Sequence, residues 1–232
     1  MASLTLRKWI LGILAVSLSI IFVSLGLWQL RRLSARRAAN AVVASRRFAP
    51  EVPLDSLPRD TATTHFRRVR IRGDYDYANE IVLTLRGRDG SPGVNILTPI
   101  RRAGNASAVL VNRGWVYSPD GVTIDTKPWR EGASVDANGF VEVFPTKGPF
   151  DAPNPARPRS MRRLDSSVLR KLFPYPIANY YVVLTDSALS GSGPPRVEPA
   201  PLDEGPHRNY AIQWFSFAAI SIGGLVIFLR RT

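Results

Sequence analysis

Residues 9–30, with the sequence WILGILAVSLSIIFVSLGLWQL, decide the fold because they form 22 consecutive positions without a charged side chain. A second uncharged run of 20 residues, YAIQWFSFAAISIGGLVIFL, occupies residues 210–229. An α-helix rises about 1.5 Å per residue, so about 20 residues cross the hydrocarbon layer of a bilayer. Each run is therefore predicted to be a membrane-spanning helix.

The first run also has the basic leader of a signal peptide, since Arg7 and Lys8 precede it. Its apolar length exceeds the roughly 7–15 residues of a signal-peptide core, and Arg31 and Arg32 follow it in place of a small-residue cleavage site. We therefore expect an uncleaved anchor. The predicted layout is a tail at residues 1–8, spans at 9–30 and 207–229, a domain at 31–190, a connector at 191–206 and a tail at 230–232.

Two crossings place both tails on one side of the membrane and the domain on the other. Arginines are more frequent just after the first span than in the tails, so the positive-inside rule alone predicts a cytoplasmic domain. Long domains are translocated despite such charge, and this count therefore does not decide the orientation.

The composition excludes several kinds of site. There are no cysteines, which excludes disulfides, thiolate zinc sites and iron–sulfur clusters, and two histidines, His65 and His207, are too few for a multi-histidine metal cage. Phosphate-loop, dinucleotide-binding, serine-hydrolase and zinc-protease motifs are missing, so we expect no enzyme. The 31 Lys and Arg against 18 Asp and Glu give a charge of +13, but the basic pairs are scattered without interleaved aromatics. This pattern favours anchoring at a membrane interface over nucleic-acid binding.

The stretch between the spans has mostly strand-like patterns. The first helix is expected to continue through residues 31–47 until a group of prolines ends it, and Asp165 and Pro174 bound a short helix at 166–173. Strands and one or two helices predict a small α+β domain on an antiparallel sheet, which can curl into a barrel. The predicted strands are 66–75, 80–85, 94–100, 108–117, 140–144 and 179–185.

Alternation along the strand at 108–117 predicts that Val109, Val111, Arg113 and Trp115 share one face. An arginine on such a face is either a paired, half-buried anchor or an edge residue with its guanidinium in water.

The start of the second span carries a histidine at the water boundary. With a helix beginning near His207, the side chains of His207, Tyr210 and Trp214 share one face. Such an imidazole suits the axial position of a metalloporphyrin, whose apolar body packs on the rings while its charged edge stays in water. A histidine in an interfacial aromatic belt needs no ligand, and position alone leaves both interpretations open. Gln29, beside Trp28, is either an interfacial hydrogen-bonding group or faces a porphyrin bound between the helices.

Both spans carry small residues at helical spacing, which predicts close packing of the two helices on each other or docking onto helices of a partner. Packing within the chain is expected. The residues are Gly12, Ala15, Ser19 and Gly26 on the first span and Ala211, Ala218, Ser221 and Gly224 on the second.

Several short motifs follow one another in an order known from one family. They are Gly26-x-Trp28-Gln29-Leu30-x-Arg32, Arg68-Val69, Gly73-x-Tyr75, Thr98-Pro99, Val111-Asn112-Arg113-Gly114-Trp115-Val116 and Pro206-His207-x-x-Tyr210-Ala211-x-Gln213-Trp214-Phe215. In these motifs, which extend over nearly the whole chain, the sequence resembles the Surfeit locus protein 1 family, whose members assist the assembly of cytochrome c oxidase. Two segments, 140–145 and 160–165, depart from the family pattern and leave the layout of the sheet open.

The resemblance implies a membrane-anchored assembly factor that holds haem a or delivers it to oxidase subunit I. It implies His207 as the haem ligand, and the residues expected around the haem are Tyr210, Trp214, Trp28 and Gln29. Implied partners are subunit I and other oxidase subunits, haem a synthase and the lipid bilayer, with no nucleic acid. The implied domain is external and both tails are cytoplasmic. Eight residues before the first span leave no room for a mitochondrial presequence, so we expect a bacterial plasma membrane. The alternative is a haem-free scaffold or accessory subunit bound to the oxidase.

Overall fold

Two long apolar helices and an eight-stranded sheet account for most of the regular structure. In the computed structural model, residues 2–58, 60–145, 154–186 and 193–231 are described. Parts of the predicted domain and connector, at 146–153 and 187–192, lie outside them, as do the ends of the predicted tails, residues 1 and 232. The chain divides into one unit of Met1–Ala44 with Pro201–Thr232 and a second unit of Ser45–Ala200.

The elements follow the chain in this order: α1 (Ala2–Arg47), β1 (Val52–Pro53), the 3-10 turn η1 (Leu54–Ser56), α2 (Thr61–Thr64), β2 (Arg68–Tyr75), η2 (Tyr77–Asn79), β3 (Ile81–Leu83), β4 (Gly93–Arg101), β5 (Ala108–Tyr117), η3 (Lys127–Trp129), β6 (Ser134–Val143), β7 (Ser160–Met161), α3 (Ser166–Leu172), β8 (Ile177–Leu184) and α4 (His207–Arg231).

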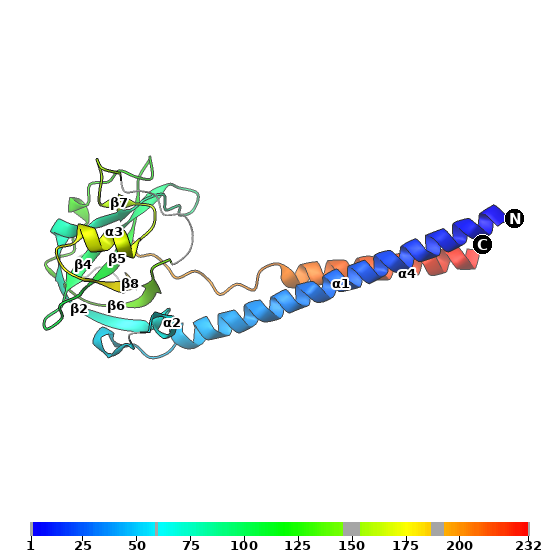
Figure 1. Ribbon diagram of the computed structural model, residues 1–232, viewed down its shortest axis with the longest axis horizontal. Helices are drawn as coiled ribbons and strands as arrows, with labels where there is room; N and C mark the ends of the chain where they lie inside the picture. Colours follow the sequence, from blue (N-terminus) through cyan, green and yellow to red (C-terminus); the bar gives the residue numbers. More distant parts are fainter. Residues whose placement is uncertain (1, 59, 146–153, 187–192, 232) are drawn as a thin grey trace. The chain divides into compact units, whose positions relative to one another are not determined.

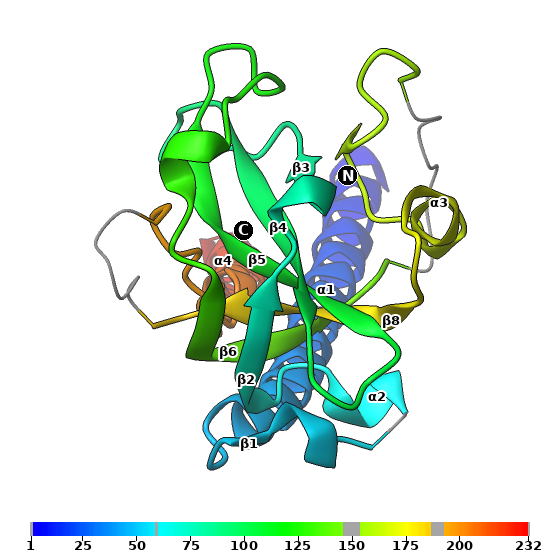
Figure 2. The ribbon, with the colours of Figure 1, turned by 90° about the vertical axis from the view of Figure 1, so that its left-hand side faces the viewer.

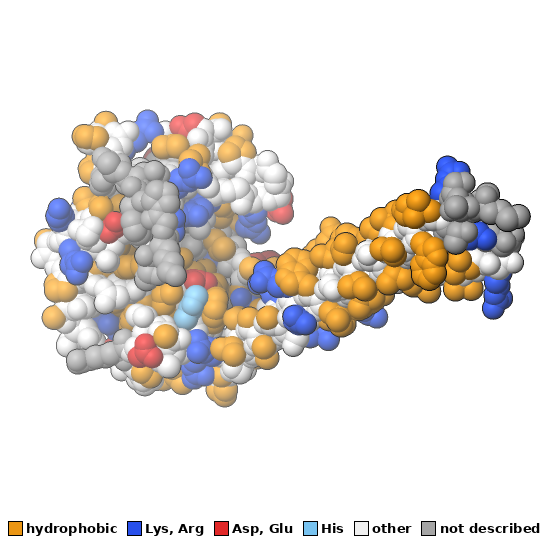
Figure 3. All heavy atoms as spheres, turned by 45° about the vertical axis from the view of Figure 1, so that its right-hand side comes forward, with side chains coloured by type: hydrophobic (Ala, Val, Ile, Leu, Met, Phe, Trp, Pro, Cys, Tyr) orange, Lys and Arg blue, Asp and Glu red, His pale blue; other side chains and the backbone are white. Residues whose placement is uncertain are grey.

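The helices of the first unit, α1 and α4, lie side by side, and both chain ends lie at the same end of the pair (Figure 1). Their most apolar 18-residue windows have mean hydropathies of 2.6 and 1.9, and only 11% and 6% of these windows is buried. Figure 3 shows hydrophobic side chains over most of the pair, with Lys and Arg side chains at both ends of the apolar stretch. Both helices are long and apolar enough to cross a bilayer, which fits a two-span membrane protein.

α1 does not stop where the apolar run stops. Residues 31–47 contain no Pro or Gly and are rich in Ala and Arg, which are good helix formers, so the helix continues to Arg47 before the proline-containing segment. This agrees with the predicted extension of the first helix.

The second unit contains a closed five-stranded barrel of β2, β6, β8, β5 and β4 (Figure 2). Four of the five contacts around it are antiparallel, and β4 closes the ring on β2 where Ile100 pairs with Tyr75. The contact between β5 and β8 is parallel, as are the edge contacts of β1 with β2 and of β7 with β3. The predicted α+β fold with a barrel-like sheet is confirmed, with parallel pairs added to the expected antiparallel ones.

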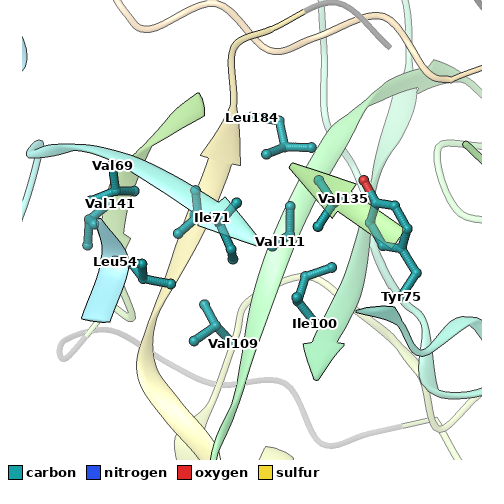
Figure 4. Close-up of a cluster of buried hydrophobic side chains, with 11 residues drawn as sticks. Leu54, Val69, Ile71, Tyr75, Ile100, Val109, Val111, Val135, Val141 and Leu184 are labelled. Carbon is teal, nitrogen blue, oxygen red and sulfur yellow. The ribbon is translucent and has the colours of Figure 1, made fainter. Parts of the chain in front are cut away.

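All five barrel strands contribute to one buried apolar cluster (Figure 4). On β2, Val69 and Ile71 are fully buried, whereas the alternate arginines on the same strand are exposed. Two of these arginines, Arg70 and Arg72, donate to Asp136 on β6 over 2.6–3.0 Å. These hydrogen bonds hold the pKa of Asp136 at about 2. The barrel wall therefore separates an apolar interior from a charge-paired exterior.

A second apolar cluster lies between the sheet and α3. α3 begins where the Asp165 carboxylate accepts from the Ser167 amide over 2.7 Å, and it buries Leu169 against Leu97 and Leu110 of the sheet. The predicted cap is confirmed, and the helix ends one residue before the predicted end.

Each predicted strand position falls on an observed strand, but β6 begins at Ser134, six residues before the predicted start at Phe140. Residues 134–139 are mostly small or polar and offer little apolar alternation, yet they pair in register with β2 from Asp74 to Val69. Their place in the sheet depends on this partner strand rather than on their own hydrophobicity. The two-residue strands β1 and β7 were too short to predict.

The alternation predicted for β5 is interrupted at Arg113. Asn112 pairs with Leu97 and Gly114 with Ile96, so β5 has one extra residue at this point, a β-bulge. Beyond the bulge Val116 is buried while the Trp115 side chain is only partly buried. The prediction that Trp115 shares the face of Val109 and Val111 is therefore wrong, because the bulge shifts the alternation by one residue.

Arg113 itself is completely buried and fully paired. Its guanidinium donates to Glu80 over 2.5 Å, to the Thr98 hydroxyl over 2.8 Å and to the Trp129 carbonyl, and Glu131 lies 3.6 Å away. Its charge also lies 5.2 Å from the centre of the Tyr77 ring. Of the two interpretations of this arginine, the paired anchor is correct, and its burial is complete rather than half.

The network extends to the segment after the barrel. Arg196 donates to both carboxylate oxygens of Glu131 over 2.7 and 2.8 Å and to the backbone carbonyl of Arg113. The amide of Trp115 donates to the Pro195 carbonyl over 2.8 Å. The Asn112–Trp115 motif thus has a structural role, since it fixes this segment to one end of the barrel.

Candidate functional site

The two apolar helices touch through small side chains. Gly26 on α1 lies directly against the ring of Phe215 on α4, because a Cβ atom there would come within 2.6 Å of that ring. Ser19 lies opposite Ala218 and its hydroxyl is 3.4 Å from the Ala218 carbonyl, while the Ser221 hydroxyl donates to the Ala15 carbonyl over 3.0 Å. The predicted packing within the chain is present, and small residues allow the close approach.

Not all of the predicted small residues take part in this contact. Gly12 and Gly224 have open space around the position of a Cβ atom, so they lie outside the helix contact. An aromatic cluster of Phe22, Trp214 and Phe217, with ring centres 5.7–5.9 Å apart, fills the contact on one side.

The polar end of this contact is formed by Gln29 and His207. Gln29 is 8% exposed, and its Oε1 atom accepts from Nδ1 of His207 over 2.8 Å. His207 is the first residue of α4, so its ring lies where the apolar segment meets the preceding polar connector. The hydrogen bond fixes the ring and places the proton on Nδ1, which leaves Nε2 as the basic nitrogen.

Nε2 of His207 remains open. Within the described part of the chain no hydrogen bond reaches this atom. Gly205 leaves room beside it, since a Cβ atom at that position would lie 3.7 Å from Nε2, and its φ of +70° favours glycine. The local backbone therefore turns tightly into α4 without covering the free nitrogen.

Side chains of α1 hold the connector that leads to His207. The carbonyl of Asp203 accepts from Arg36 Nε over 3.1 Å and from the Asn40 amide over 3.0 Å. Arg37 donates to both carboxylate oxygens of Glu204 over 2.7 and 2.9 Å, and this hydrogen bonding lowers the pKa of Glu204. Two turns of α1 thus position the residues immediately before the histidine.

A cleft of about 420 Å³ lies between this connector and α1. Its floor contains Ala35 and Ala39, which carry no long side chains, and Arg32 and Arg36 stand on the same face of α1. His207 forms part of the opposite wall. The volume is within the range of small-molecule sites, about 300–1,000 Å³. The remaining lining residues are Glu204 and Gly205.

The predicted site residues do not all gather at this cleft. His207 and Gln29 are in direct contact, whereas Trp214 lies about two turns further along α4 and packs in the aromatic cluster. Tyr210 and Trp28 are 47% and 50% exposed on the outer surface of the pair.

Sequence reasoning missed Arg32, Arg36 and Gly205 as site residues. The sequence pattern that could have indicated them is a pair of arginines four residues apart, beginning one turn after Gln29, and a glycine two residues before His207.

The other histidine has a different setting. His65 Nε2 is 2.7 Å from Glu142 Oε2, and its ring stacks on Phe66 with ring centres 3.6 Å apart. This ring nitrogen already has a partner, which leaves His207 as the better candidate for an external ligand. Among the described residues there is no group of three or more His, Asp or Glu arranged to hold a metal ion.

Comparison with known proteins gives a consistent result. The SURF1 family model matches residues 16–219, which include most of α1, the whole barrel and the first half of α4. The Surfeit locus protein 1 of Homo sapiens is 25% identical, with 97% of this chain and 78% of that protein aligned. The Xenopus tropicalis protein of the same name is also 25% identical, and the aligned part spans about half of its length, 51%. The cytochrome oxidase assembly protein SHY1 of Saccharomyces cerevisiae is 28% identical over 47% of this chain and 28% of its own length.

Proposed function

We propose, from the premise that this chain belongs to the SURF1 family, that it is a membrane-anchored assembly factor for cytochrome c oxidase. The family match over most of α1, the barrel and the first half of α4 supports this proposal, as does the name of the yeast relative, a cytochrome oxidase assembly protein. The expected partners are oxidase subunit I, other oxidase subunits and haem a synthase. We also propose a bacterial plasma membrane as its location, with both tails cytoplasmic and the barrel outside.

The cargo we propose is haem a, held through His207. One observation carries this assignment: the Gln29 hydrogen bond occupies Nδ1 of His207 and fixes the ring, while Nε2 stays open beside a cleft. Neutral imidazole with one nitrogen bonded and the other free is the form in which histidine ligates haem iron.

The surroundings of His207 suit an amphipathic cargo. Trp28, which adjoins Gln29, and Tyr210, which follows His207 by one turn, expose aromatic surface on the outside of the helix pair, and toward the connector the cleft is basic. A haem has an apolar ring system and two carboxylates on one edge, so its two sides match these two environments. A holding role requires no chemical step by this chain, which fits a non-enzymatic factor.

The test uses the full-length protein purified in detergent after co-expression with haem a synthesis. We expect a bound porphyrin whose absorption changes in His207→Ala, because the iron loses its axial nitrogen. His65→Ala is the matched control, since His65 is already paired with Glu142 and its loss is expected to leave the spectrum unchanged.

If His207→Ala leaves both the bound haem and oxidase assembly unchanged, the ligand role is wrong. Copurification of wild-type protein with an oxidase that lacks haem a, or stoichiometric presence in the mature oxidase, supports a haem-free scaffold or accessory subunit instead.

A further inference from the structure

Arg32 and Arg36 are the unexplained feature of the cleft beside His207. They lie four residues apart on α1, so they project from one face about 6 Å apart along the helix axis. Within the described residues Arg32 has no hydrogen bond, and Arg36 uses only Nε, on the Asp203 carbonyl. Two guanidinium groups therefore face the cleft with most of their donors available.

The carboxylate in the cleft lining does not neutralise them. Glu204 lines the cleft, but both of its oxygens accept from Arg37, a third arginine that is not part of the lining. The lining thus has an excess of positive charge next to an open imidazole nitrogen, and the adjacent Asp203 carboxylate accepts from the Gly205 amide rather than from either arginine. Such an excess is unfavourable for the free protein and favours an anionic ligand.

The position of the charges along α1 sets the orientation of that ligand. Arg36 and Arg32 lie on the connector side of Gln29, while Trp28 and the apolar run lie on the other side. Ala35 lies between the two arginines along α1 and Ala39 lies beyond Arg36, and these short side chains leave room for a carboxylate edge beside the guanidinium groups. A ligand bound at Nε2 would therefore direct its carboxylates toward the arginines and its apolar part toward the bilayer.

We infer that Arg32 and Arg36 bind the two propionate carboxylates of a metalloporphyrin and select for a porphyrin with free acid groups. This inference rests on the proposed function, because it takes His207 as the iron ligand. Arginine suits the role because its planar group binds carboxylates through two parallel hydrogen bonds. The two arginines are specificity and orientation residues, distinct from the ligand itself.

The test compares hemin with hemin dimethyl ester, which has the same iron and ring but no free carboxylates. Full-length protein in neutral detergent is titrated with each probe, and the Soret absorption gives the dissociation constant. We expect wild-type protein to bind hemin more tightly than the ester. Arg32→Ala and Arg36→Ala are each expected to weaken hemin binding about 5-fold, the upper range for an exposed ion pair, and the double variant about 20-fold.

The controls separate the charge effect from general damage. Arg31→Ala removes a neighbouring exposed arginine that does not line the cleft, and its hemin affinity should equal that of wild type. The double variant should bind the ester as wild type does and keep the position of its Soret band, because the histidine ligand is retained. Loss of ester binding or a shifted band in the double variant would show a structural effect of the arginines and overturn the inference.

The remaining outcomes distinguish the two proposals. Equal wild-type affinity for hemin and its ester overturns the propionate assignment while leaving the histidine ligand intact. Wild-type protein that binds neither probe, or a His207→Ala variant with an unchanged spectrum, overturns both. If added phosphatidylglycerol abolishes the preference for hemin as completely as the double variant does, the arginines bind lipid phosphate and the assignment is refuted.

Discussion

Replacing Arg113 by methionine should destabilise the barrel more than any other single removal of an arginine from β2 or β5. The guanidinium is inaccessible to water and pairs with Glu80, which is 8% exposed. Removal of Arg113 leaves Glu80 with the Thr98 hydroxyl as its remaining partner, at 2.8 Å, whereas Glu131 keeps both bonds from Arg196. Breaking a buried ion pair in this way costs about 3–5 kcal/mol, because one charge is left unpaired in an apolar setting.

The cost is measured as the free energy of unfolding of the full-length protein in detergent, followed by tryptophan fluorescence in urea. For a unit of this size it corresponds to a fall in melting temperature of about 6–20 °C. Arg72→Met is the matched control, since Arg72 also pairs with a carboxylate but is 68% exposed, and about 1 kcal/mol or less is expected.

A double-mutant cycle identifies the cause. Glu80→Met added to Arg113→Met removes the stranded charge, so the double variant should be more stable than the sum of the single effects by at least about 1 kcal/mol. Additive effects, or a cost of Arg113→Met no larger than that of Arg72→Met, would show that the pairing does not explain the burial of this arginine.

Two further predictions concern the second unit. Gly114→Ala should release the 194–196 segment and destabilise the protein by about 2 kcal/mol or more, because the φ of Gly114 is +152° and a Cβ atom would come within 2.3 Å of the Pro195 carbonyl. Gly104→Ala is the control, since Gly104 has φ +73° and open space around it, and its cost should be about 1 kcal/mol. Equal denaturation midpoints for the two variants would contradict the steric explanation. Asp136 has a folded pKa of about 2, below its value in the unfolded chain, so its stabilising contribution is present above pH 4 and is lost as pH falls toward 2. In Asp136→Asn the free energy of unfolding should therefore fall less steeply as the pH is lowered from 6 to 2.5, which urea titrations at each pH measure. An unchanged fall would show that other groups cause the loss of stability in acid.

The parts of the fold that sequence predicts are those fixed by local pattern. The two uncharged runs predict both long helices, since 20 successive apolar residues have few other stable settings. Val69 and Ile71 between exposed arginines show the alternation of a half-buried strand, and Asp165 before a short apolar repeat marks the start of α3.

The parts that sequence misses depend on partners far away in the chain. Residues 134–139 are strand because β2 lies beside them, and β8 lies between β6 and β5 through one antiparallel and one parallel contact. Arg113 shows the same limit, since the groups that pair with its guanidinium are distant in the chain: Glu80 just after η2, the Thr98 hydroxyl on β4, and the Trp129 carbonyl and Glu131 between β5 and β6. No local periodicity reports such contacts.

In the candidate site, too, local features can be predicted from sequence, whereas contacts between distant residues cannot. The face shared by His207 and Tyr210 follows from helix geometry, but the contact of His207 with Gln29 joins residues 178 positions apart. The cleft could not be foreseen, because its wall depends on how Asp203 and Glu204 are bound to α1. The roles assigned to the five predicted site residues remain predictions.

The position of β8 in the barrel has a consequence for biosynthesis. β8 separates β6 from β5, so until Leu184 has left the ribosome the growing sheet has two unpaired strand edges. At about 5–20 residues per second, the stretch from the end of β2 to the end of β8 takes on the order of ten seconds to synthesise. During this interval the unpaired edges of β5 and β6 can pair with wrong strands. Slowed translation between β6 and β8 should therefore raise the fraction of newly made protein that aggregates.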